Sequence, residues 1–335
     1  MADDCKLQIE HCKLSICNLQ WPICNGPAAR RSITKILAIV LLVPCCLASG
    51  QSPPVKVAAI DGEPVYAAEV ERELAEAYGD RKLADDQRRA LLTRARDQVI
   101  DRRLVLKRLV RLGEAASTAD VDHALAKLEK QVADQGVALA EHYKQLGITR
   151  DQVRHSLVWK LSWQQYLAKQ LHDENLQKYF ERNRRDFDGT ELKVAHLLIK
   201  PSGDDEAARA AARQRAEQIR ESLVSGKTTF AEAAKQHSTG PSAKDGGDIG
   251  WIQRREPMPE AFSAAAFALN PGEVSRPVAT TFGVHLIQVQ QVKAGTTTWQ
   301  EAADDLRPAV TLFLFRWLAD KERETAKVER VEDWP

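Results

Sequence analysis

The hydrophobic periodicity of the chain changes at Leu192, and this change limits the possible folds more than any other feature. Residues 193–200 (KVAHLLIK) form an apolar run typical of a buried strand. Three further strand-like runs follow, at residues 249–253, 274–279 and 284–292. Helical patterns separate them, at residues 204–224, 230–236 and 259–269. The order of these elements predicts an α+β domain with a small sheet flanked by helices.

The segment that precedes this domain is predicted to be mostly helical. Near its start, apolar residues flank Asp61-Gly62, a pair typical of a β-hairpin turn. Helical spacing follows over residues 87–112. Two capping patterns then predict helices that begin after Ser117 and Thr149.

The final stretch, residues 298–328, also has a helical pattern with a dense apolar surface. We expect this surface to pack against the earlier helices, because burying a large apolar side chain contributes on the order of 1.5–3 kcal/mol. The two helical segments would then build one domain, into which the α+β domain is inserted. The apolar side chains are Leu306, Val310, Phe313, Phe315, Trp317 and Leu318.

The first 50 residues have the pattern of a secretory signal peptide. Basic residues precede the apolar run ILAIVLLV at residues 36–43, and small residues follow it. The run is shorter than the ~20 apolar residues of a membrane-spanning helix. We therefore expect residues 1–50 to be removed and the protein to be exported. The alternatives are a lipid anchor at Cys46, which would make the protein membrane-associated, and a twin-arginine export route.

Composition and cysteine placement exclude several classes of function. The formal net charge is +1 over 335 residues, so no broad field attracts nucleic acid or acidic lipid. All six cysteines lie in the first 46 residues, without the CxxC spacing that marks zinc sites. We expect no metal, and the exported protein would contain no cysteine.

Three pieces of sequence within the α+β segment recur together in one protein family. The first is VAHLLIK, which carries His196. The second runs from STGPSAKDGGDIGWI at residues 238–252 into MPEAFSAAAFAL at residues 258–269. The third is NPGEVSRPVATTFGVHLIQV at residues 270–289, which carries His285. In this order and spacing they resemble the parvulin-type peptidyl-prolyl cis-trans isomerases.

The resemblance implies a parvulin domain over residues 188–294 with an active site built on two histidines. His196 and His285 correspond to the paired histidines beneath the parvulin active site. Thr280 corresponds to the hydroxyl residue that hydrogen-bonds with them. We expect the histidines to fix the geometry of the site, because isomerisation needs no net proton movement.

The pocket that accepts the proline ring corresponds, by the same resemblance, to Ile249, Met258 and Phe262. Met258 and Phe262 are four residues apart, so we expect them on one face of a helix. A substrate pocket must stay partly open, and we therefore expect both side chains to matter more for turnover than for stability.

The flanking segments resemble those of SurA-like and PrsA-like exported folding factors, on VAAIDGEPV near the start and on residues 179–187. This resemblance implies a chaperone-like helical domain over residues 51–187, with a C-terminal helix at residues 295–335 packed on it. Its partners would be unfolded or partly folded exported proteins with X-Pro bonds, and not nucleic acid.

The chemistry of X-Pro isomerisation is consistent with a chain that has no metal or cofactor motif. The partial double bond must twist through a barrier of ~18–20 kcal/mol, but no bond breaks. An enzyme needs only an apolar pocket and a site that favours the twisted amide. We therefore predict a peptidyl-prolyl isomerase that assists the folding of exported proteins. The alternatives are a non-catalytic chaperone that binds unfolded clients and an accessory factor for export.

Two positions depart from the family pattern. Many parvulins carry Asp-Cys where this chain has Thr239-Gly240, so cysteine nucleophilic catalysis is not expected here. Phosphoserine-directed parvulins carry a basic cluster after the first strand, where this chain has Lys200 followed by the acidic residues 204–206. We expect that loop to repel a phosphate.

Overall fold

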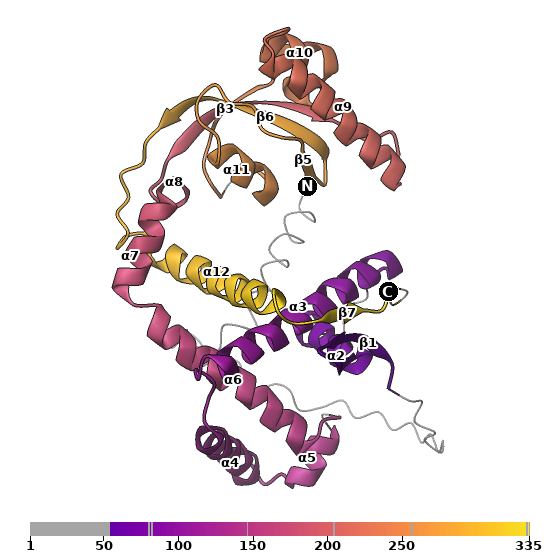
Figure 1. Cartoon of the computed structure of the whole chain (residues 1–335), viewed down its shortest axis with the longest axis vertical. Helices are drawn as coiled ribbons and strands as arrows, with labels where there is room; N and C mark the ends of the chain where they lie inside the picture. The colour runs from indigo at the N-terminus through magenta and orange to yellow at the C-terminus, as the bar shows by residue number, and fades with distance from the viewer. Residues whose placement is uncertain are drawn as a thin grey trace. The chain divides into compact units, whose positions relative to one another are not determined.

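The computed structural model describes residues 54–334 except residues 80, 82, 146, 204, 256 and 333. The expected signal peptide at residues 1–50 and the alternative anchor at Cys46 lie outside the described residues. The described chain divides into two compact units, whose elements are labelled in Figure 1. One unit combines the chain up to Leu171 with the stretch from Pro308 onward, and the other is His172–Arg307.

The first unit begins with a β-hairpin and continues in helices. Asp61 and Gly62 have φ angles of 49° and 85°, so both adopt the left-handed conformation that a tight hairpin turn requires. The expected hairpin is confirmed. The elements are β1 (Lys56–Ile60), β2 (Glu63–Tyr66), α2 (Ala67–Tyr78), α3 (Asp85–Arg111), α4 (Thr118–Asp134), α5 (Leu139–Gln145), α6 (Arg150–Gln170), most of α12 (Ala303–Arg323) and β7 (Val328–Arg330).

The capping patterns begin helices where the sequence predicts them. The Ser117 hydroxyl accepts a hydrogen bond from the Asp120 amide at the start of α4. Thr149 and Gln152 form a reciprocal capping box at the start of α6. These are contacts within one turn, and for that reason they can be predicted from neighbouring residues alone.

The core of the first unit joins α6 to α12 through aromatic rings. Trp159 and Trp163 stack with centroids 5.8 Å apart, and Phe315 meets both rings edge-on. The expectation that the whole apolar surface of the last helix is buried is wrong for Phe313 and Trp317, which are 47% and 41% exposed. The helix carries apolar residues around more of its circumference than one partner can cover.

Strand β7 is an element that the sequence does not predict. It pairs antiparallel with β1, so the first sheet has the order β2-β1-β7. A three-residue strand has almost no local pattern, and it is defined by the backbone of the distant strand that pairs with it.

The second unit contains a four-stranded antiparallel sheet with the order β4-β3-β6-β5. Two helices, α9 and α10, cover one face, and α11 covers the other (Figure 1). The elements are α7 (Asp173–Arg182), α8 (Arg184–Phe187), β3 (Glu191–Ile199), α9 (Glu206–Val224), α10 (Phe230–His237), the short 3₁₀ helix η2 (Pro241–Asp245), β4 (Asp248–Ile252), α11 (Glu260–Phe267), β5 (Val278–Thr280) and β6 (Gly283–Lys293).

The strand expected at residues 274–279 is shorter than the sequence suggests. β5 starts at Val278, and only Val274 makes an isolated bridge to Gln288 before it. Pro277 has no backbone N–H and cannot continue a ladder, which explains the late start. None of the helices among the residues described above has the length and apolar character needed to cross a membrane.

Candidate active site

Strands β3 and β6 bring His196 and His285 together. In the antiparallel register, His196 lies opposite Ile287 and His285 lies opposite Leu198. The two Nδ1 atoms are 3.2 Å apart, and the rings stack with centroids separated by 5.4 Å. Both histidines are nearly buried, at 6% and 3% exposure. Residues that are 89 positions apart in the sequence thus form one contiguous group.

Thr280, at the end of β5, extends this group by one hydrogen bond. Its Oγ1 lies 2.8 Å from Nε2 of His285. The same hydroxyl oxygen accepts a hydrogen bond from the Phe282 amide at 3.1 Å. The structure therefore joins Thr280, His285 and His196 in a chain of hydrogen bonds.

The environment of the two rings favours their neutral forms. Burial, together with the positive charge that His196 can carry, lowers the pKa of His285 to about 4. Burial also lowers the pKa of His196. The facing Nδ1 atoms have room for one proton between them, since two N–H groups would point at each other. At neutral pH both rings are therefore uncharged, which suits a positioning role.

Phe262 of α11 encloses the histidine pair. Its ring meets His196 edge-on at 5.7 Å and His285 edge-on at 5.4 Å. Phe262 is completely buried, in a cluster with Val194 and Ile287. The expectation that Phe262 lines a partly open pocket is wrong, because its ring is fully buried in the core on this face of the sheet. From this burial we expect its truncation to cost stability.

Ile249 and Met258 lie at the edge of the same cluster. Both are partly buried and pack against it together with Val278, which the sequence reasoning missed. Met258 precedes α11 and is not on the helix, whose N-cap is Pro259. The expected shared helix face with Phe262 is therefore wrong. Partly exposed apolar side chains above a buried ring can form an apolar surface for a substrate.

The loop after α10 is attached to β3 beside His196. The Thr239 amide donates to the Leu198 carbonyl at 2.8 Å, and the Ser238 hydroxyl accepts from the Leu198 amide at 3.1 Å. A Cβ at Gly240 would lie 3.6 Å from Nε2 of His196, an ordinary contact distance. The position thus adjoins His196, and a side chain larger than glycine would fit there.

Gly247 allows β4 to approach His196 closely. The His196 amide donates to the Gly247 carbonyl at 2.8 Å, and the φ angle of Gly247 is 84°. A Cβ there would lie 2.4 Å from the His196 carbonyl oxygen, so only glycine fits. The sequence reasoning did not single out Ser238 or Gly247, although both lie in the glycine-rich piece that carries the resemblance.

The loop after β3 carries no cluster of basic side chains among its described residues. Lys200 is exposed. Asp205 caps α9 by accepting a hydrogen bond from the Ala208 amide at 2.7 Å. Glu206 forms an ion pair with Arg213 farther along α9. Within the part of the chain that the structure describes, no three His, Cys, Asp or Glu side chains lie together as a metal site would require.

Comparisons with known proteins identify the domain that contains this site. The model of the Rotamase family, described as the PPIC-type PPIASE domain, matches residues 196–291. Chaperone SurA of Bordetella parapertussis is 46% identical over 103 residues, which are 30% of this chain and 19% of that protein. Foldase protein PrsA of Bacillus subtilis is 29% identical over 172 residues, 51% of this chain and 52% of that protein.

A crystal structure of the peptidylprolyl isomerase PrsA from Bacillus anthracis is 22% identical to this chain. The match covers 68% of this chain and 94% of that structure, with a TM-score of 0.33. The chain thus spans about a fifth of the length of the SurA relative and about half of the PrsA relative.

Proposed function

We propose that this chain, whose residues 196–291 are a PPIC-type peptidyl-prolyl isomerase domain, is an exported folding factor that isomerises X-Pro bonds in unfolded or partly folded proteins. The observation that carries this proposal is the buried, neutral pair of His196 and His285, bonded to Thr280 and enclosed by Phe262. The helical unit would hold the client while its prolines are isomerised.

The geometry suits a reaction that twists a bond without breaking it. An apolar surface at Ile249 and Met258 can take up the proline ring and exclude water from the prolyl amide. Fewer hydrogen bonds from water to the carbonyl favour the twisted, less conjugated amide over the planar one. The neutral histidines place no charge beneath the prolyl amide, and their contacts hold the Phe262 ring in a fixed orientation.

The proposal is tested by following isomerisation of short X-Pro peptides in a protease-coupled assay with the purified protein. We expect the rate to rise in proportion to protein concentration, and Met258→Ala to lower kcat/KM because it removes part of the apolar surface. Leu223→Ala, on the other face of the sheet, is the matched control and should keep its activity per folded molecule. A wild-type protein that leaves the uncatalysed rate unchanged would refute the enzymatic proposal.

One observation favours a second candidate, a chaperone that binds clients without turning them over. Gly240 presents no side chain beside Nε2 of His196, at the position where many parvulins carry a cysteine. A protein that suppresses the aggregation of an unfolded client while showing no isomerase activity would support this second candidate.

We further expect no preference for phosphorylated Ser-Pro sequences. The carboxylates of Asp205 and Glu206 would repel a phosphate bound beside them. Lys200 supplies a single positive charge, which does not compensate for two negative ones. We expect kcat/KM for a phosphoserine-proline peptide to be no higher than for the glutamate-proline and serine-proline peptides. Faster turnover of the phosphorylated peptide would contradict this prediction.

Export rests on the sequence of residues 1–50, which lie outside the described residues. We propose cleavage after a signal peptide, with lipidation at Cys46 as the alternative. The test is to sequence the N-terminus of the protein recovered from outside the cytoplasm. An N-terminus at Met1 or Ala2 would contradict cleavage, and a blocked, lipid-modified Cys46 would identify the anchor.

A further inference from the structure

The sheet of the second unit has another face, opposite the histidine pair. Along β3, His196 faces α11, whereas Ala195 and Leu197 pack toward α9 and α10. On β6, His285 likewise faces α11, and Leu286 packs toward α9 and α10. Side chains that alternate along a strand point to opposite faces, so anything bound beside Ala195 is separated from the histidines by the sheet.

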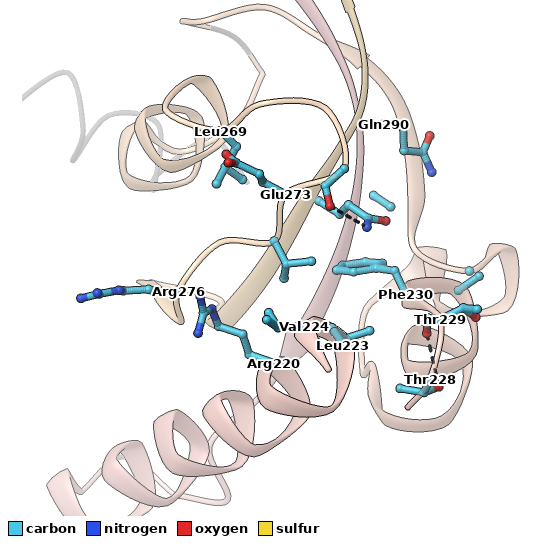
Figure 2. A pocket seen from close by; sticks show the side chains of 16 residues that line it. Arg220, Leu223, Val224, Thr228, Thr229, Phe230, Leu269, Glu273, Arg276 and Gln290 are labelled. Atoms are coloured by element: carbon cyan, nitrogen blue, oxygen red, sulfur yellow. Dashed lines mark hydrogen bonds between the residues drawn. The ribbon is translucent and has the colours of Figure 1, made fainter. Parts of the chain in front are cut away.

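This second face contains a cavity of about 890 Å³ (Figure 2). Its volume lies within the ~300–1,000 Å³ range of small-ligand sites. It is bounded by the end of α9, the start of α10 and the loop before β5. Much of its lining is apolar, from Ala195, Leu223, Val224, Phe230, Leu269 and Val274.

Two arginines line one end of this cavity. In Figure 2, Arg220 and Arg276 lie at that end, Gln290 lies at the other, and Phe230 lies between them. Arg276 is exposed and forms no ion pair with a carboxylate of the described chain. Nη1 of Arg220 donates to Glu217 at 3.1 Å, but its buried Nε has no hydrogen-bond partner among the described residues. This N–H group is available to an acceptor on a ligand.

Glu273 is the acidic residue of the lining, and its carboxylate already has a role. Oε2 accepts a hydrogen bond from the Asn270 amide at 2.8 Å, which fixes the turn after α11 and lowers the pKa of Glu273. The carboxylate therefore remains charged on the turn and forms no ion pair with either arginine. Arg220 is already ion-paired with Glu217, so the free positive charge at this end of the cavity is that of Arg276, beside the remaining N–H groups of Arg220.

An exposed tryptophan lies on the same face, one cross-strand row from the cavity. Trp251 of β4 lies opposite Lys193 of β3. Two residues farther along β3, Ala195 lies between Asp248 of β4 and Gln288 of β6. Two residues along a strand span ~7 Å, within the reach of an extended peptide. Trp251 is 46% exposed, whereas Ala195 and Gln288 line the cavity. The Lys193–Asp248 ion pair lies between the cavity and this ring, so Trp251 offers a separate aromatic contact on the same face.

We infer that this face is a second client-binding site, which takes an extended segment carrying a carboxylate side chain beside aliphatic or aromatic ones. The carboxylate pairs with Arg220 and Arg276, and the apolar side chains enter the cavity around Phe230. The inference rests on the proposed function as a folding factor. A client held here leaves the histidine face free, and its prolines reach that face at a raised effective concentration.

The test measures the binding of a fluorescent, proline-free peptide of alternating leucine, phenylalanine, aspartate and glutamate to the full chain. A matched peptide replaces the acids by asparagine and glutamine. We expect the acidic peptide to bind about fivefold more tightly, as two partly exposed ion pairs would give. The double variant Arg220→Gln, Arg276→Gln should abolish this difference. Val224→Glu should weaken the acidic peptide more than the neutral one, because it adds repulsion to the loss of apolar lining.

The control is Arg215→Gln, which removes an exposed charge from the same helix outside the cavity and should leave binding unchanged. Turnover of a short X-Pro substrate should be the same in all these variants. Unaltered binding of the acidic peptide by the double variant, or no difference between the two peptides on the wild type, would overturn the site. Arginine-dependent binding by a protein without isomerase activity would support the site while refuting the enzymatic proposal.

Discussion

Replacing Phe262 with alanine should lower the free energy of unfolding of the parvulin domain by about 3–5 kcal/mol. Phe262 has no exposed surface and is among the largest fully buried side chains of the described chain. Its removal would leave a cavity beneath two histidine rings that it meets edge-on. Hydrogen exchange of the β3 and β6 amides in the full chain would report this loss for the domain alone.

A matched aromatic control is available in the same domain. Phe282 is 51% exposed, so Phe282→Ala should change the free energy of unfolding by less than about 0.5 kcal/mol. Phe262→Leu keeps most of the volume and should cost less than about 1.5 kcal/mol. An equal loss of unfolding free energy in Phe262→Ala and Phe282→Ala would show that Phe262 does not stabilise the core on this face.

The parvulin domain should become less stable as the pH falls from 7.5 to 5. His285 has a pKa of about 4 in the folded state against an ordinary value of 6.5, so the unfolded chain binds more protons between these values. The stability that the neutral His285 contributes is therefore fully present above about pH 6.5 and is lost as the pH falls toward 4. His285 alone should lower the free energy of unfolding by about 2 kcal/mol between pH 7.5 and pH 5.

The lowered pKa of His196 should add to this loss. Carboxylates such as Glu191 and Glu273, whose pKa values the fold lowers, lose their contribution mainly at still lower pH. Hydrogen exchange of β3 and β6 at the two pH values measures the effect. His285→Asn should flatten the pH dependence, whereas the exposed His155→Gln should leave it unchanged. A domain equally stable at pH 5 and 7.5 would contradict the neutral histidine pair.

The residues that carry the resemblance are also the ones that the sheet brings together. The sequence determined the identities of His196, His285 and Thr280, and the strand-like runs that hold them. It also determined the hairpin at Asp61-Gly62 and the capping box at Thr149. These features depend on backbone preferences and hydrogen bonds within a few residues, so their causes are present in the local sequence.

The tertiary structure decided which apolar side chains are buried and how deeply. Met258 and Phe262 have similar hydrophobicity, yet Phe262 is enclosed by β3, β6 and α11 while Met258 lies before the helix at the edge of the cluster. In the last helix, Phe315 is covered by two tryptophans, whereas Phe313 remains half exposed. Burial depends on segments far away in the chain, which periodicity cannot identify.

The separation between the two faces of the parvulin sheet also came from the tertiary structure. The adjacent residues Ala195 and His196 belong to different sites because the strand alternates and different helices cover each side. The sequence determined the alternation along β3. Only the packing of α9, α10 and the loop before β5 produced the cavity with Arg220 and Arg276 on the face away from the histidines, because a cavity is bounded by segments that meet only in the folded chain.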